Sequence, residues 1–171
     1  MKLSRLLEPL QGTEAVQDVE ITDIVYDSRK AKPGCAFVCM RGSASDGHKY
    51  AAGAVKAGAV AVIAEEPVEA PGAQVVLVPD TRKALALMSA VFFGRPAEGE
   101  IRVIGVTGTK GKTTTAYMIR SILESAGYKT GIIGTIGVLI GEELMETENT
   151  TPMSYDIQMY LRRMVDAGCG Y

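Results

Sequence analysis

The chain has 171 residues, of which 47% are apolar and 22% are charged, so it can bury a core in one ordinary domain or in two small ones. Its formal net charge of −2, without a basic cluster, argues against a nucleic-acid or membrane-surface partner. No apolar run reaches membrane-spanning length, and the N-terminal segment contains Glu8 and Pro9, which a signal peptide would avoid. We therefore expect a cytoplasmic protein with no nucleic-acid partner and no membrane insertion.

The three cysteines, Cys35, Cys39 and Cys169, form an odd set with no Cys-x-x-Cys pair, which argues against a disulfide framework or a zinc site. Cys35 and Cys39 are four residues apart in a strand-like stretch, so they share one face. We expect both to be small, reduced core residues rather than a metal-binding or redox pair.

The first half of the chain alternates short apolar runs with turn signals. Pro33-Gly34 is a strong turn signal, residues 42–47 form a polar loop, and Asp80 or Thr81 can cap a following helix. Strands are expected at 19–26, 35–40, 59–64 and 75–78, and helices at 48–57 and 81–93.

The second half follows residues 94–99, a polar stretch rich in Gly and Pro that is the best candidate for a domain boundary. The apolar run that comes next has the composition of a buried strand, Gly127 is placed to end a helix, and Ser154 is placed to cap one. Strands are expected at 101–107 and 129–133, a hairpin around Gly141 at 138–145, and helices at 113–126 and 154–167.

This succession of strand, glycine loop, helix and strand is typical of an α/β fold with a mainly parallel sheet. We expect two α/β domains, residues 1–98 and residues 99–171. Residues 168–171 resemble the start of another strand, and a βαβ domain of about 70 residues is too small to cover both faces of its sheet. We therefore expect the second domain to be truncated, with its C-terminal part missing.

Residues 107–114, Thr-Gly-Thr-Lys-Gly-Lys-Thr-Thr, lie between an expected strand and an expected helix, which is the context of a phosphate-binding loop. Glycines let backbone N–H groups turn towards an anion, and the helix N-terminus adds partial positive charge. Lys112 can neutralise the β- and γ-phosphates of ATP, and the Thr113 hydroxyl can ligate Mg²⁺. The ATP-binding candidates are Gly108, Thr109, Lys110, Gly111, Lys112, Thr113 and Thr114, with Lys112 as the catalytic candidate.

The spacing of this loop is shorter than the common Gly-x-x-x-x-Gly-Lys pattern, because Val106 stands where that pattern has its first glycine. The match is therefore to Gly-x-x-Gly-Lys-Thr, and the alternative is a glycine-rich turn with an incidental lysine. The strand expected before the loop and the helix expected after it favour nucleotide binding.

The loop resembles the ATP loop of the Mur ligases, which extend the peptidoglycan stem peptide. Further segments resemble the MurE type, the UDP-N-acetylmuramoyl-tripeptide synthetases, and all of them occur in order along the whole chain. One departure is Lys110, where many members of the family have Asn. The segments are Asp27-Ser28-Arg29 with Pro33-Gly34 and Phe37-Val38, then Asp46-Gly47-His48, then Glu148-Asn149-Thr150-Thr151-Pro152.

The resemblance implies that residues 1–98 bind the uridine-diphosphate end of the substrate and that residues 99–171 begin a P-loop-type ATP-binding domain. Many members carry His-Gln where this chain has Ser43-Ala44. The implied substrate-binding residues are Tyr26, Ser28, Ser43, Ala44 and Ser45 for the uridine end, and Asn149, Thr150 and Thr151 for the muramoyl-peptide end.

Other interpretations of these segments stay open. Asp27-Ser28-Arg29 is read equally well as a strand-end turn with a local ion pair, and residues 149–151 as a helix-capping loop before Pro152. His48, the single histidine, is expected at a helix start or on the surface rather than as a catalytic base.

The resemblance also implies a reaction. The carboxylate of UDP-N-acetylmuramoyl-L-alanyl-D-glutamate would attack the γ-phosphate of ATP, and the amine of a diamino acid, meso-diaminopimelate or L-lysine, would then displace phosphate from the acyl phosphate. The cofactors implied are ATP and Mg²⁺, and the chain alone is expected to be an inactive fragment. The alternatives are a MurF-type ligase and a non-catalytic nucleotide-binding module.

Overall fold

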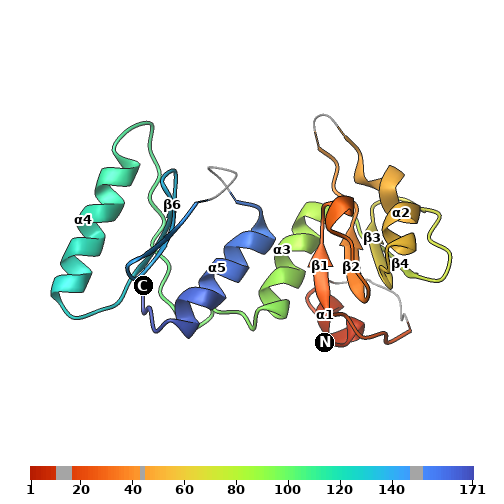
Figure 1. The fold of residues 1–171 in the computed structure, drawn as a ribbon, viewed down its shortest axis with the longest axis horizontal. Coiled ribbons are helices and arrows are strands. Elements are labelled where there is room, and N and C mark those ends of the chain that lie inside the picture. The colour runs from red at the N-terminus through yellow and green to blue at the C-terminus, as the bar shows by residue number, and fades with distance from the viewer. Residues whose placement is uncertain (11–16, 43–44, 147–151) are drawn as a thin grey trace. The chain divides into compact units, whose positions relative to one another are not determined.

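The computed structural model describes residues 1–10, 17–42, 45–146 and 152–171. The chain forms two compact units, Met1–Phe92 and Phe93–Tyr171, and Figure 1 shows the elements of each. The domain boundary expected between residues 98 and 99 stays a prediction. Among the described residues, no helix combines the length and the apolar character needed to cross a membrane.

The first unit is built on a four-stranded parallel sheet. Its strands, in the order β1-β2-β3-β4, are β1 (Asp23–Val25), β2 (Cys35–Val38), β3 (Ala61–Ala64) and β4 (Gln74–Leu77). Its helices are α1 (Leu3–Leu7), the 3₁₀ turns η1 (Ser28–Lys30) and η2 (Gly47–Tyr50), α2 (Ala51–Lys56) and α3 (Thr81–Phe92). The α/β class and the parallel sheet predicted from the sequence are confirmed here.

Both faces of this sheet are covered, since every residue of β2 and β3 is buried. On one face, α2 packs through Ala51 and Ala54 on Phe37 and Val62. Cys35 and Cys39 belong to the same cluster, as the sequence predicted, and burial raises the pKa of the Cys39 thiol to about 12. Gly34, which ends the predicted turn, has a φ of 81°, a left-handed value that favours glycine.

The second unit contains α4 (Lys112–Ser125), β5 (Gly131–Gly134), β6 (Gly137–Ile140), β7 (Glu143–Met145) and α5 (Ser154–Asp166). The three strands form an antiparallel meander rather than the parallel sheet expected for this half. A physical reason is the tight connection between β5 and β6, which can join only antiparallel neighbours. The hairpin expected around Gly141 is confirmed as β6 and β7.

The buried strand expected at 101–107 is not formed. Arg102 N–H donates to the Gly170 carbonyl at 3.0 Å, but beyond it no described residue hydrogen-bonds the backbone of residues 103–107. Val103 and Ile104 are 62% and 51% exposed. An apolar run forms a strand only where a neighbouring strand hydrogen-bonds its N–H and C=O groups. Here the Gly170 backbone supplies one such hydrogen bond, which is too few for a strand.

Helix ends follow the expected chemistry with one correction. The Asp80 carboxylate accepts from Lys83 N–H at 2.9 Å and so caps α3, and Gly127 follows α4 with a φ of 86°. Ser154, however, is the first residue of α5 rather than its cap. The cap position is Met153, whose N–H donates to the Asp156 carboxylate at 3.2 Å. The acidic residue in the first turn therefore accepts from the N–H of the cap residue.

Candidate functional site

The glycine loop of the second unit leads directly into α4, one residue earlier than the sequence indicated. Gly111 occupies the helix N-cap position with a φ of 79° and a ψ of −5°, and Gly108 has a φ of 152°. A left-handed residue at this position turns the chain sharply into the helix, and glycine adopts that conformation without a steric cost. The two glycines thus set the path of the loop.

The amide groups of this loop lack acceptors within the described part of the chain. No described residue accepts a hydrogen bond from the N–H groups of residues 109–113. Helix geometry explains part of this, because the first N–H groups of a helix have no carbonyl before them to bond. Lys112 Nζ donates to the Gly108 carbonyl at 2.7 Å, which holds the ammonium over the loop. The loop therefore presents several donors and the positive charges of Lys110 and Lys112 to solvent.

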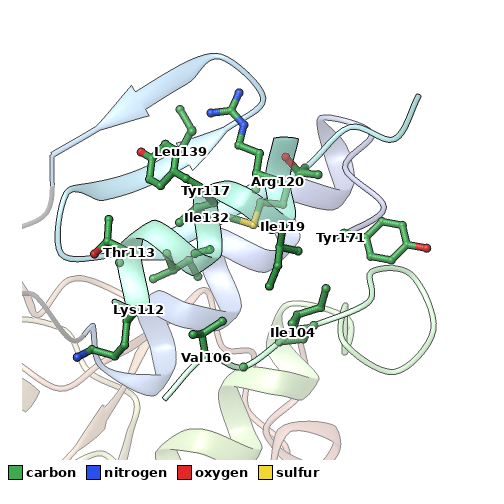
Figure 2. Close-up of a pocket in the computed structure, with 18 of the residues that line it drawn as sticks. Ile104, Val106, Lys112, Thr113, Tyr117, Ile119, Arg120, Ile132, Leu139 and Tyr171 are labelled. Atoms are coloured by element: carbon green, nitrogen blue, oxygen red, sulfur yellow. The ribbon is translucent and has the colours of Figure 1, made fainter. Parts of the chain in front are cut away.

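An apolar cleft of about 490 Å³ lies beside the loop, within the second unit. It runs between residues 101–106, α4 and β5, and the side chains of α5 contribute to it. Figure 2 shows Lys112 and Thr113 projecting from the first turn of α4, with the Lys112 amino end pointing away from the labelled apolar side chains. Lys112 and Thr113 thus bring the start of α4, directly after the glycine loop, to the wall of the cleft.

Tyr26 and Ser28 follow β1, where the first unit has a tight turn. The Asp27 carboxylate accepts from Arg29 N–H at 3.0 Å and pairs with the Arg29 guanidinium at 2.7 Å. These hydrogen bonds, above all those from the Arg29 side chain, lower the pKa of Asp27 to about 2. The strand-end turn with a local ion pair is therefore present, and a binding role for Ser28 stays a prediction.

Ser45 lies in the loop that follows β2, the strand next to β1. Its carbonyl accepts from Gly42 N–H at 2.9 Å, and its hydroxyl lies 3.4 Å from the Tyr50 hydroxyl. In a parallel sheet the carboxyl ends of adjacent strands meet at one edge, where α/β proteins bind ligands. Tyr26, Ser28 and Ser45 are thus brought to one edge. The other implied residues, Ser43, Ala44, Asn149, Thr150 and Thr151, lie outside the described residues.

His48 lies at a helix start, as expected, because it is in the first turn of η2, which leads into α2, and the Asp46 carboxylate caps that turn. It is not at the surface, because it is only 8% exposed. Two neighbouring residues were not predicted from the sequence: Glu65, whose N–H donates to His48, and Arg41, which pairs with Asp46 and Glu65. Both are charged residues at the ends of apolar strands, and no motif singles them out. Their positions directly after β2 and β3 could have indicated them, because these positions lie on the sheet edge that also carries Ser45.

Comparison with protein families agrees with this arrangement. Residues 20–93 match the Mur ligase family, catalytic domain, and residues 106–171 match the Mur ligase middle domain. The chain therefore belongs to the Mur ligase family, whose members use ATP.

Individual relatives indicate which members of this family the chain resembles. The UDP-N-acetylmuramoyl-L-alanyl-D-glutamate–2,6-diaminopimelate ligase of Clostridium perfringens is 44% identical over 96% of this chain and 33% of its own length. A solved structure of a ligase with the same name has a TM-score of 0.78 at 25% identity, and the alignment covers 99% of this chain and 34% of that one. The Thermotoga maritima MurF ligase, solved in complex with ADP, shares the fold with a TM-score of 0.56 at 24% identity, over 82% of this chain and 28% of its own. The chain thus spans about a third of the length of these relatives.

Proposed function

We propose that this chain supplies the uridine-nucleotide site and the ATP phosphate loop of a MurE-type ligase that adds diaminopimelate to UDP-N-acetylmuramoyl-L-alanyl-D-glutamate in peptidoglycan synthesis. The observation that carries the proposal is the set of backbone N–H groups at residues 109–113 without described acceptors, next to the Lys112 ammonium. Such an array at a helix N-terminus binds phosphate oxygens.

The loop residues fit a nucleotide triphosphate. Gly108 and Gly111 leave the inner surface of the loop open, because a Cβ built at Gly111 would meet nothing within 4 Å and one built at Gly108 would touch only the Lys110 carbonyl. Lys112 would bind the β- and γ-phosphates, assisted by Thr109, Lys110 and Thr114. The Thr113 hydroxyl would hold Mg²⁺, which neutralises phosphate charge when bound.

The first unit would hold the other end of the reaction. Tyr26, Ser28 and Ser45 offer hydroxyl groups at one sheet edge, and hydroxyls hydrogen-bond a uracil edge or a pyrophosphate without bringing a fixed charge. Residues 43–44 and 149–151 would complete the binding of the uridine-diphosphate and muramoyl-peptide ends. Support comes from the curated relatives, which carry this UDP-linked substrate in their names.

In the proposed reaction the free carboxylate of the substrate attacks the γ-phosphorus of ATP, the bond to the leaving ADP breaks, and an acyl phosphate forms. The amine of diaminopimelate then attacks the acyl carbon and releases inorganic phosphate. Lys112 would stabilise the negative charge that develops on the transferring phosphoryl group. We favour diaminopimelate over lysine because relatives at 40–46% identity are named as diaminopimelate ligases, and we favour MurE over MurF for the same reason.

A titration of this chain with AMP, ADP and ATP in the presence of Mg²⁺ tests the proposal. Because the β- and γ-phosphates would occupy the loop, we expect affinity to rise steeply from AMP to ADP and ATP. In amide-resolved NMR spectra, the largest shifts should fall on residues 108–113. Equal affinity for all three nucleotides, or shifts that leave these residues unchanged, would show that the loop is only a turn.

A further inference from the structure

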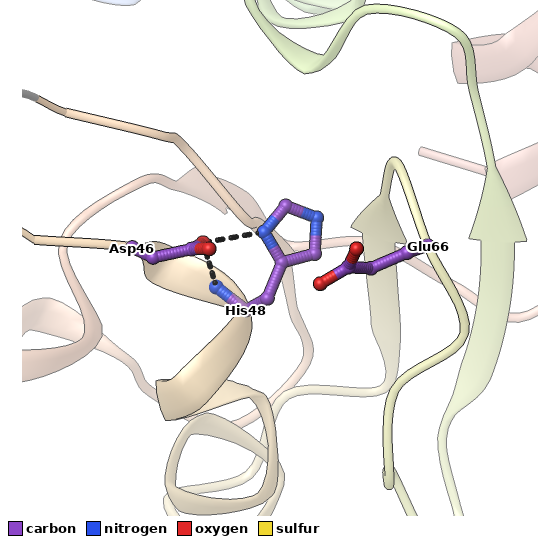
Figure 3. A group of neighbouring side chains, drawn as sticks. All are labelled: Asp46, His48 and Glu66. Carbon is purple, nitrogen blue, oxygen red and sulfur yellow. Dashed lines mark hydrogen bonds and ion pairs between the residues drawn. The ribbon is translucent and has the colours of Figure 1, made fainter.

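A second set of polar side chains gathers at the carboxyl edge of the sheet in the first unit, around the buried His48. The His48 Nδ1 atom lies 2.6 Å from the Asp46 carboxylate, and the Nε2 atom accepts a hydrogen bond from Glu65 N–H at 2.9 Å. Figure 3 shows Asp46 on one side of the imidazole and Glu66 on the other. The ring therefore joins the loop after β2 to the segment after β3.

These contacts fix the hydrogen-bonding state of the neutral imidazole. Because Nε2 accepts from a backbone amide, the ring proton must reside on Nδ1, from which it is donated to Asp46. The same carboxylate accepts from His48 N–H at 3.0 Å. The His48 side chain is the main cause of a lowered pKa at Asp46, so the carboxylate is charged at neutral pH. Both ring nitrogens are thus in use.

A metal ion does not fit this cluster, although Asp46, His48 and Glu66 bring ligand atoms within 4.8 Å of one another. Neither imidazole nitrogen keeps a lone pair for coordination. The Arg41 guanidinium supplies the positive charge instead, at 2.8 Å from Glu66, 3.3 Å from Glu65 and 3.6 Å from Asp46. All three carboxylates therefore already share a cation that the chain itself supplies.

The contacts extend from this cluster into two neighbouring elements. The Glu65 carboxylate accepts from both the N–H and the hydroxyl of Thr81, at 2.9 and 2.8 Å, where α3 begins. On the other side, Arg41 and Asp46 form an isolated antiparallel bridge that closes the base of the loop after β2. Ser45 stands inside that base, one residue before Asp46. These contacts thus hold the backbone next to the Ser45 hydroxyl, which is proposed to contact the substrate.

We propose that His48, with Asp46 as its partner, is a positioning residue for the uridine-diphosphate site, since it fixes the backbone on which Ser45 is carried. At 8% exposure it is too buried to contact a ligand directly. It acts through Asp46, which links the ring to the loop base. This inference rests on the proposed uridine-nucleotide site of the first unit. It adds His48 and Asp46, which are not among the residues proposed to contact the substrate.

Calorimetric titration of the chain with UDP tests the inference through three substitutions. Asp46→Ala removes the acceptor for both His48 donors, and we expect UDP affinity to fall at least about fivefold, the size of one displaced hydrogen bond. Asp46→Asn keeps a carbonyl oxygen that can accept from the ring, so it should restore most of the affinity. Glu66→Ala is the matched control, because Glu66 belongs to the same cluster, is 54% exposed, and has no hydrogen bond to His48.

ATP affinity and the melting temperature of each variant separate positioning from general stability. Positioning predicts that Asp46→Ala weakens UDP binding while ATP binding stays within about twofold of wild type. The inference is overturned if folded Asp46→Ala binds UDP as wild type does, or if Glu66→Ala weakens UDP as much as Asp46→Ala. Failure of the wild-type chain to bind UDP would instead contradict the proposed function on which the inference rests.

Discussion

Lys112 is the residue whose charge the proposed ATP site depends on most. Its ammonium is 2.7 Å from the Gly108 carbonyl and has no carboxylate partner among the described residues, so a phosphate group can pair with it. We expect Lys112→Ala to weaken ATP binding at least about tenfold, because a hydrogen bond to a charged group contributes about 1.5–3 kcal/mol. Lys56→Ala is the control, since it removes an exposed lysine from α2, in the unit that does not contain the phosphate loop, and it should bind within about twofold of wild type. Titration with Mg·ATP measures both, and equal loss in both variants would contradict a special role for Lys112.

A substitution at Ser28 should distinguish UDP binding from ATP binding. It begins η1 at the carboxyl end of β1, in the unit that does not contain the phosphate loop. Ser28→Ala should therefore weaken UDP binding by about 0.5–1.5 kcal/mol, the value of one hydrogen bond between neutral groups, and leave ATP binding unchanged. Titration of the variant with each ligand checks this. If both affinities fall equally, or neither does, Ser28 is only a turn residue.

Asp27 gives a prediction on pH. Its pKa is about 2 in the folded chain, below the ordinary 3.8, because Arg29 hydrogen-bonds its charged form. A carboxyl group with a lowered pKa stabilises the fold above its unfolded pKa and loses that contribution as pH falls through the folded value. The stability difference between wild type and Asp27→Asn should thus be constant from neutral pH to above 3.8 and shrink between 3.8 and about 2. Denaturant unfolding across this range measures it, and a difference that grows on acidification would contradict the assignment.

Gly111 is a single residue that determines where a helix begins, because its left-handed φ of 79° sets the start of α4. An alanine in this conformation costs roughly 1–2 kcal/mol, so Gly111→Ala should destabilise the second unit and weaken ATP binding. Gly105→Ala is the matched control. It has no positive φ, and a Cβ there would meet nothing within 4 Å. Unfolding curves of the two variants should differ by that amount, and equal curves would show that the loop accepts other conformations.

At the level of helices and strands, the sequence predicts those elements that local residue patterns determine. The strands that become β1 to β4, the cap of α3, the Gly127 helix end and the Gly141 hairpin all depend on residues close in the chain. The apolar run 101–107 shows the limit, because its pattern specifies a strand while its pairing depends on a neighbour far along the chain. The network around His48 was missed for the same reason. Arg41, Asp46 and Glu65 come together only when β2 and β3 pair.

Across the whole molecule, exposed apolar side chains gather in the second unit. No residue of α4 is buried, Met118 and Ile122 are 62% and 70% exposed, and the backbone of residues 103–107 has no described partner. The chain also spans only about a third of the ligases it resembles. We therefore expect it to bind nucleotides without catalysing ligation, and the second unit to unfold before the first.

A phosphate-release assay checks this expectation, with the UDP-linked dipeptide substrate, ATP, Mg²⁺ and diaminopimelate present together. Release should not exceed that of the Lys112→Ala chain, which serves as the background. Release that depends on diaminopimelate and is lost in this variant would mean that the catalytic groups are complete within these residues.

In a thermal unfolding experiment, UDP should raise the melting temperature of the first unit, because a ligand that binds only the native state stabilises it.

The chain is proposed to carry two separate nucleotide sites, a uridine site in the unit Met1–Phe92 and a phosphate loop in the unit Phe93–Tyr171. Amide-resolved NMR titration of the wild-type chain, first with UDP and then with Mg·ATP, tests this most directly. UDP should shift amides around Ser28, Ser45 and Asp46, ATP should shift those of residues 108–113, and each ligand should leave the other set unchanged. Shifts of one common set by both ligands, or no saturable shift with either, would contradict the account.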